Sequence, residues 1–138
     1  MIDLHSFGPK FGMILLVGSF YTFAKSQQGE SIHLDNTKFG MQVALTAEAG
    51  KGGALAVIML KAQELVTAMS GCQAYIVQLS VSDEHTILIT EVWENKAAHQ
   101  ASLANPQVLA LITQAKPLIT NMQHQIGKPI GLDGINSP

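Results

Sequence analysis

Residues 71–108, GCQAYIVQLSVSDEHTILITEVWENKAAHQASLANPQV, decide the fold of this chain. Two runs within them, 75–77 and 86–92, are rich in β-branched and aromatic residues, and the polar residues 82–84 separate the two runs. This pattern is typical of an antiparallel β-hairpin. A helical stretch begins directly behind Trp93, the only tryptophan of the chain. The segment therefore predicts a sheet and, beside the indole, a candidate cleft.

The second run of the hairpin carries apolar side chains on both faces. Because side chains alternate along a strand, its residues divide into two sets. One face holds Ile87, Ile89, Glu91 and Trp93, and the other holds Leu88, Thr90 and Val92. An antiparallel layer with two apolar faces needs cover on both. We therefore expect helices on one face and, on the other, a second subunit or an additional segment, with a homodimer as the hypothesis.

The residues around the hairpin predict the remaining elements. Apolar residues recur at helical spacing, Asn95 and Asn105 are suitable N-caps, and Pro117 ends or kinks the last helix. The predicted elements are a strand over 39–46, a turn over 48–53, a helix over 55–69 that Gly71 ends, the hairpin, a helix over 95–103, a helix from Asn105-Pro106 with Val108, Leu109, Ile112, Ala115 and Ile119 on its apolar side, and an edge strand over 123–130. This order is that of a ferredoxin-like α+β sandwich, with an antiparallel sheet and helices on one face.

The composition limits the classes of function. The chain has 138 residues, enough for one domain with a core, and is 47% hydrophobic with 13% charged residues. A net charge of -2 without any Lys/Arg cluster argues against nucleic acid as a partner. Cys72 is the only cysteine, which excludes an internal disulfide and fits a reducing compartment. The five histidines show no metal-ligand spacing, so we expect no metal site.

The first 37 residues differ from the rest. The apolar run 11–24 follows Lys10 and ends in small residues, which superficially resembles a secretory signal. It is too short for a membrane span, which needs about 20 apolar residues. We expect an N-terminal extension and linker over 1–37, a domain over 38–132 and a tail over 133–138. A cytoplasmic protein without membrane contact is predicted, and export with residues 1–24 as a signal peptide is the alternative.

Several short motifs follow one another in the domain: Gly71-Cys72 followed by Tyr75, Glu91-Val92-Trp93-Glu94, Ala98-His99, Ser102-Leu103 and Pro106 before a helix. In their order and spacing they resemble the antibiotic biosynthesis monooxygenase (ABM) family, in particular its quinol monooxygenases. The resemblance covers residues 38–132 and implies a dimeric α+β barrel of ferredoxin-like halves, with a pocket between sheet and helices. The family includes oxygenases that act on quinols and polyketide anthrones without metal or flavin, heme-degrading enzymes, and an isomerase of a phosphorylated signalling molecule.

Two departures from the family pattern narrow the range of activities that the resemblance implies. Heme-degrading relatives carry a second tryptophan and a heme-ligating histidine where this chain has Ser102 and Ile112, so heme degradation is disfavoured. Many quinol-type relatives keep a histidine near the place of Ser102. His99, one helical turn earlier and on the same face, can take its part.

The chemistry of such a site can be stated from its residues. A phenol reacts with dioxygen more readily as its anion, so the site must remove a proton and stabilise an oxyanion away from water. His99 is the candidate base because its ordinary pKa is near neutrality. Glu91 is the second candidate catalytic group, since a carboxylate on a buried face must be paired or have a raised pKa; at a rim it is only a solvated charge.

Five further residues are predicted to contact the substrate. They are Trp93, Tyr75, Ser102, Met59 and Ile112. Trp93 can stack on an aromatic ligand, Tyr75 offers a hydroxyl to an oxyanion, and methionines adapt to apolar ligands. For Trp93, Tyr75 and Met59, ordinary packing in the sheet or core is the competing interpretation.

The sequence as a whole predicts a cofactor-independent monooxygenase that oxidises quinol-like or polyphenolic aromatic molecules with O2. The alternatives are an isomerase and a noncatalytic small-molecule binding protein of the same fold. The glycine-rich turn 50–53 lies between a strand and a helix, where backbone amides can hold an anion. It lacks the order of a phosphate-binding P-loop, which weakens the isomerase alternative.

Overall fold

A computed structural model describes residues 37–131 of the chain. The expected element over 11–24, the signal-peptide alternative and the tail over 133–138 lie outside these residues. The elements in chain order are β1 (Phe39–Ala47), α2 (Gly52–Thr67), β2 (Cys72–Leu79), β3 (Thr86–Trp93), α3 (Lys96–Leu103), α4 (Pro106–Ala115), the 3-10 turn η1 (Lys116–Leu118) and β4 (Ile119–Gly127). This order confirms the predicted ferredoxin-like α+β arrangement.

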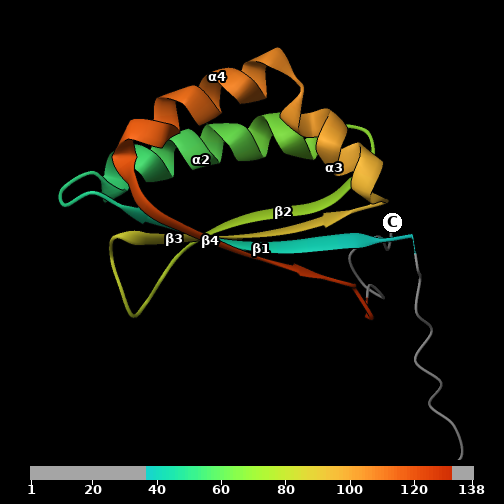
Figure 1. Cartoon of the computed structure of the whole chain (residues 1–138), viewed down its shortest axis with the longest axis horizontal. Coiled ribbons are helices and arrows are strands. Elements are labelled where there is room, and N and C mark those ends of the chain that lie inside the picture. Colours follow the sequence, from blue (N-terminus) through green and yellow to red (C-terminus); the bar gives the residue numbers. More distant parts are fainter. Residues whose placement is uncertain (1–36, 132–138) are drawn as a thin grey trace, which may run out of the picture. The chain divides into compact units, whose positions relative to one another are not determined.

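The four strands form one antiparallel sheet in the order β2-β3-β1-β4. All three helices lie on the same face of that sheet (Figure 1). The predicted hairpin is the β2-β3 pair, whose turn is held by Asp83. Its carboxylate accepts hydrogen bonds from the His85 backbone N–H at 3.0 Å and the Thr86 hydroxyl at 2.6 Å.

Asparagine caps begin both short helices, as the sequence predicted. Asn95 Oδ1 accepts from the Ala98 backbone N–H at 2.8 Å. Asn105 Oδ1 accepts from the amides of Gln107 at 2.9 Å and Val108 at 3.3 Å, and Pro106 occupies the first turn. Each cap satisfies amides that have no partner within the helix.

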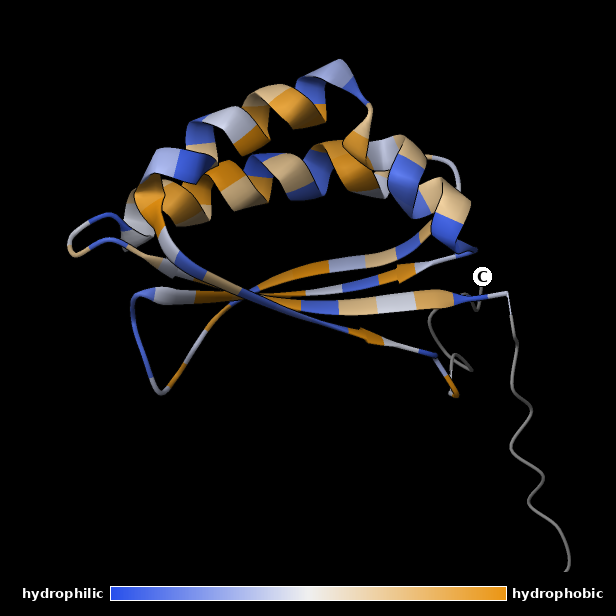
Figure 2. Ribbon diagram, viewed as in Figure 1, coloured by the Kyte–Doolittle hydropathy of each residue, from blue (hydrophilic) through white to orange (hydrophobic). Residues whose placement is uncertain are grey.

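The last strand differs from the prediction. It spans Ile119–Gly127 rather than residues 123–130, and Ile119 pairs with Ala47 instead of extending the apolar side of α4. Pro117 ends the helix as expected, but the short turn η1 returns the chain to the sheet at once. Leu109, expected on the buried side of α4, is 47% exposed. The start of β4 at Ile119 was not predicted, because the strand is largely polar and Ile119 also fits the apolar spacing of the preceding helix (Figure 2).

The core lies between the helices and the sheet and has two parts. The first contains Leu45, Ala47, Leu55, Met59, Ile87, Ile89 and Ala115. The second, which we call the indole cluster, contains Phe39, Val66, Trp93 and Val108. Ile87, Ile89, Glu91 and Trp93, predicted from alternation to share one face, all point into this layer and are buried. The opposite face of the sheet carries no helix in the described part of the chain.

Candidate functional site

Glu91, Trp93 and His99 form a buried polar group beneath α3. Trp93 Nε1 donates a hydrogen bond of 2.9 Å to Glu91 Oε2. His99 Nε2 lies 3.7 Å from the same carboxylate oxygen, which is too far for a hydrogen bond. Within residues 37–131, this imidazole nitrogen is buried and has no hydrogen-bond partner. A carboxyl group and a free imidazole nitrogen therefore face each other in the protein interior.

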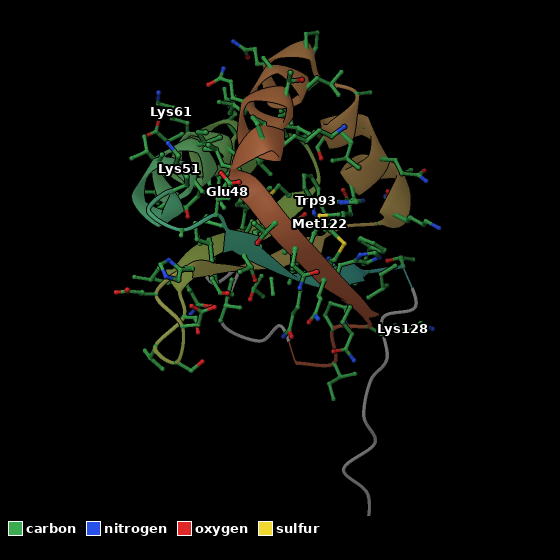
Figure 3. The ribbon with its side chains drawn as sticks, turned by 60° about the vertical axis from the view of Figure 1, so that its left-hand side comes forward. Glu48, Lys51, Lys61, Trp93, Met122 and Lys128 are labelled. Atoms are coloured by element: carbon green, nitrogen blue, oxygen red, sulfur yellow. The ribbon has the colours of Figure 1, made fainter. Side chains whose placement is uncertain are left out.

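The sequence places these three groups by simple local rules. Glu91 and Trp93 are two residues apart on β3, so both point to the helix-covered face. Asn95 then starts α3 directly behind the strand, and His99 follows one turn later with its backbone N–H bonded to Asn95 O at 3.4 Å. The helix thus brings His99 back over the strand end. Trp93 lies between the sheet and the helical layer (Figure 3).

Aromatic contacts fix the imidazole ring. The ring centroids of His99 and Phe39 are 4.9 Å apart, with an interplanar angle of 32°. The indole of Trp93 meets His99 edge to face at 5.7 Å and 70°. Phe39 had no assigned role in the sequence analysis. The register of β1 against β3 places Phe39 directly opposite Trp93. This pairing cannot be read from the sequence of either strand alone.

Burial shifts both ionisable groups toward their neutral forms. The pKa of Glu91 is raised because burial disfavours the carboxylate, and the hydrogen bond from the indole opposes part of this rise. The pKa of His99 is lowered, first by burial and then by the positive charge of Lys96. A neutral imidazole beside a carboxyl group with a raised pKa can accept or return a proton without creating an isolated buried charge.

Two groups of β2 border the same carboxyl. Tyr75 is the register partner of Glu91, and Cys72 is the partner of Trp93. Burial and then the charge of Glu91 raise the pKa of the Tyr75 hydroxyl, so the phenol stays a neutral hydrogen-bond donor. The same two causes raise the pKa of the Cys72 thiol. This supports Cys72 as a small half-buried residue rather than a nucleophile.

The structure brings together most, but not all, of the residues singled out from the sequence. His99, Glu91, Trp93 and Tyr75 meet, and Ile112 packs on the indole cluster. Ser102 is buried on α3, but its hydroxyl donates to His99 O at 2.7 Å. Met59 packs in the other part of the core, with Leu55 and Ile87. Met59 therefore lies in the first part of the core and not in the indole cluster.

Among the described residues, the indole is closed off from solvent, since Trp93 is 0% exposed. Its neighbours are apolar side chains from the sheet and the helices, together with the Glu91 carboxyl and the His99 ring. Two hollows stand out, of about 600 and 420 Å³. Both lie on the open face of the sheet, and both are lined by Gln42, Thr90 and Gln125. Trp93 and His99 line neither hollow, whereas Glu91 is among the residues that line the smaller one.

The described residues contain no group of three or more metal-ligating side chains. Among the helices of residues 37–131, none is both long and apolar enough to cross a membrane. Neither finding bears on the residues outside this range.

Comparison with known proteins gives consistent results. The family model for antibiotic biosynthesis monooxygenase matches residues 39–114. A solved structure from Chloroflexus aurantiacus, provisionally named an antibiotic biosynthesis monooxygenase, is 33% identical, with 72% of this chain and 100% of that chain covered and a TM-score of 0.67. A provisionally named monooxygenase from Deinococcus radiodurans is 26% identical, with 68% and 97% covered and a TM-score of 0.61.

SnoaB, a cofactor-independent oxygenase from Streptomyces nogalater, shares the fold at 14% identity, with 69% of this chain and 95% of that chain covered and a TM-score of 0.62. No curated protein sequence matches the chain. The family match and the solved structures together support a general monooxygenase-like function. The chain belongs to the antibiotic biosynthesis monooxygenase family.

Proposed function

We propose that this protein is a cofactor-independent monooxygenase that oxidises quinol-like or polyphenolic aromatic molecules with O2. The observation that carries the proposal is the buried pair of Glu91 Oε2 and His99 Nε2, 3.7 Å apart, with the imidazole nitrogen unpartnered among the described residues. A buried acid–base pair next to an indole suits the deprotonation of a flat phenol. Family membership supports the same reaction class.

The reaction balances without an external reductant. His99, assisted by Glu91, takes the phenolic proton, and the electron-rich ring passes electrons to O2. A C–O bond then forms at a ring carbon that carries hydrogen, giving a hydroperoxide. Loss of water from the hydroperoxide leaves a quinone, so one oxygen atom stays in the product and the other leaves as water. The organic substrate supplies all four electrons.

The neighbouring groups have supporting roles in this proposal. The neutral Tyr75 hydroxyl donates a hydrogen bond to the developing oxyanion, and the Trp93 indole holds Glu91 while offering an apolar surface to the ring. Ile112, which packs on the indole cluster, and Ser102, buried on α3, would contact the bound ring. Methionine and aromatic side chains, including Met41 and Phe39, would shift to admit the substrate.

Oxygen uptake tests the proposal. With a panel of hydroquinones and anthrones, we expect consumption of one O2 per quinone formed. His99→Gln and Glu91→Gln should each lower kcat by about a hundredfold, the low end of acid–base contributions. His85→Gln is the matched control, because His85 lies in the hairpin turn and lines neither hollow. Unchanged turnover in His99→Gln would remove the imidazole from the mechanism.

A noncatalytic binding protein is the second candidate, and one observation favours it. Trp93 is fully buried, and the hollow of about 600 Å³ on the open face is lined mainly by amide and apolar residues, with His124 among them. In that case aromatic ligands would raise the melting temperature without oxygen consumption. Product formation without O2 consumption would instead indicate an isomerase.

The proposal also covers the oligomeric state, the cellular compartment and the partners of the protein. We propose a homodimer that acts in the cytoplasm on small molecules, with neither nucleic acid nor membrane as partner. The uncovered sheet face supports the homodimer, since it exposes Ile76 at 48% and Leu88 at 38%.

A further inference from the structure

The first turn of α3 rests directly on Gly71, in the turn between α2 and β2. Gly71 has a φ of +82°, a backbone conformation that residues with a side chain rarely adopt. A Cβ added there would lie 2.6 Å from the Cβ of Ala98. The Gly71 carbonyl also accepts a hydrogen bond of 2.7 Å from the backbone N–H of Glu94. Contact and hydrogen bond together tie this turn to the start of α3.

The residue that follows Ala98 is His99. The two share one helical turn, in which Asn95 Oδ1 accepts from the Ala98 backbone N–H at 2.8 Å. Because α3 is only eight residues long and has a formed cap, we expect it to move as a unit when its first turn is pushed. Any group that forces Ala98 outward therefore carries the imidazole away from Glu91.

We propose that Gly71 is a positioning residue for the Glu91–His99 pair. By lacking a side chain, it lets α3 approach the sheet closely enough to hold His99 Nε2 at 3.7 Å from Glu91 Oε2. Gly71 touches neither reacting group and acts through Ala98. This inference rests on the proposed function of the pair as the acid–base centre, but the geometry it predicts can be measured without any substrate.

The environment of His99 makes its protonation a sensitive reporter of this geometry. The titratable groups on neighbouring elements are Glu91 on β3, Cys72 and Tyr75 on β2, and Lys96 on α3 itself. The residues from α2 and α4 in the indole cluster, Val66 and Val108, are apolar. Burial is the leading cause of the lowered pKa of His99. Moving α3 outward lets water reach the ring and raises that pKa toward its ordinary value.

The experiment is an NMR titration of the His99 ring, assigned by the signal that disappears in His99→Gln. Gly71→Ala is compared with Gly50→Ala, because Gly50 has a similar φ of +76° but no atom within 4 Å of an added Cβ. Both substitutions place an alanine at a positive φ, and only the one at Gly71 brings a new Cβ against Ala98. We expect the His99 midpoint to rise in Gly71→Ala by about half a pH unit or more, roughly threefold in proton affinity, and to stay unchanged in Gly50→Ala.

Two further variants complete the test. Gly71→Ala with Ala98→Gly restores the space and should return the midpoint toward that of the wild type. Ala98→Val adds bulk to the Gly71–Ala98 contact from the α3 side and leaves the residue at position 71 unchanged. It should raise the titration midpoint of His99 even where Gly71→Ala does not fold. Equal midpoints in Gly50→Ala and Gly71→Ala, or an unchanged midpoint in Ala98→Val, would overturn the inference. Failure of the oxygen-uptake test would leave it standing, since the titration uses no substrate.

Discussion

At the residue scale, the site depends on a carboxyl group that the fold has removed from water. Glu91 is 7% exposed, and its one direct hydrogen bond among the described residues comes from the indole of Trp93. Burial of an ionisable group without an ion pair costs free energy unless the group becomes neutral. The raised pKa of Glu91 is therefore also a statement about stability.

Glu91→Gln should alter how stability depends on pH. Because the folded-state pKa of Glu91 is raised, its contribution is fully present below the unfolded-state pKa, about 4.3, and is lost as the pH rises through the folded-state pKa. We expect the free energy of unfolding of the wild type to fall, relative to Glu91→Gln, over that window. Urea unfolding between pH 4 and 8 measures this, with the exposed Glu64→Gln as control. Parallel curves for wild type and Glu91→Gln would contradict the expectation.

Trp93→Phe should destabilise the fold and raise the pKa of Glu91 further. The substitution leaves Glu91 Oε2 without its donor and removes part of a fully buried ring, a combination worth about 2 kcal/mol. Urea unfolding gives the loss of stability, and the pH dependence of that loss gives the pKa change. Phe39→Leu is the control, since it trims the same cluster without touching the hydrogen bond. A Trp93→Phe protein with the stability of the wild type would show that the indole bond contributes nothing.

At the element scale, the asparagine caps decide where the helices begin, and so where the site residues lie. α4 carries Ile112 and part of the indole cluster, and it starts at an asparagine that binds two backbone amides. Replacing that side chain leaves both amides without their partner.

Asn105→Ala should lower the free energy of unfolding by about 1 kcal/mol, the usual loss for an N-cap. The lost bonds are those of Asn105 Oδ1 with the amides of Gln107 and Val108. Thermal or urea unfolding measures the change. Asn121→Ala, on the exposed strand β4, is the control and should leave stability within about 0.5 kcal/mol of the wild type. Equal losses in both variants would show that the cap has no special role.

At the scale of the whole molecule, the described domain is a two-layer structure with one sheet face left uncovered. The helices bury one face, whereas the other exposes Ile76 and Leu88 among glutamine and threonine side chains. An apolar strip of this kind on a sheet favours association. Because the two faces alternate along each strand, a second subunit on the open face would leave the Glu91–His99 pair on its own side of the sheet.

Sedimentation of the full chain at micromolar concentration should return a dimer. Leu88→Glu places a charge on the open face and should shift the protein toward monomers, because each copy would bury a carboxylate against the other. Val81→Glu is the control, since Val81 lies in the hairpin turn and is fully exposed. A wild type that sediments only as a monomer would mean that the open face is not a dimer interface.

The sequence alone determined the elements and their order. Alternation along β3 predicted that Glu91 and Trp93 share a face, and the asparagine caps predicted where α3 and α4 begin. These features depend on residues close together in the chain, so local pattern was sufficient. The early start of β4 was missed because pairing with β1 determines it, and its own residues are too polar to signal a strand.

Only the tertiary structure decided the geometry of the site. The 3.7 Å approach of His99 to Glu91, the place of Phe39 against the imidazole, the separation of Met59 from the indole and the burial of the indole all depend on how α3 and α4 pack on the sheet. Such packing is set by side-chain volumes that meet from distant parts of the chain. The sequence could therefore name the chemical groups of the site, whereas their distances and the space between them emerged only in the folded molecule.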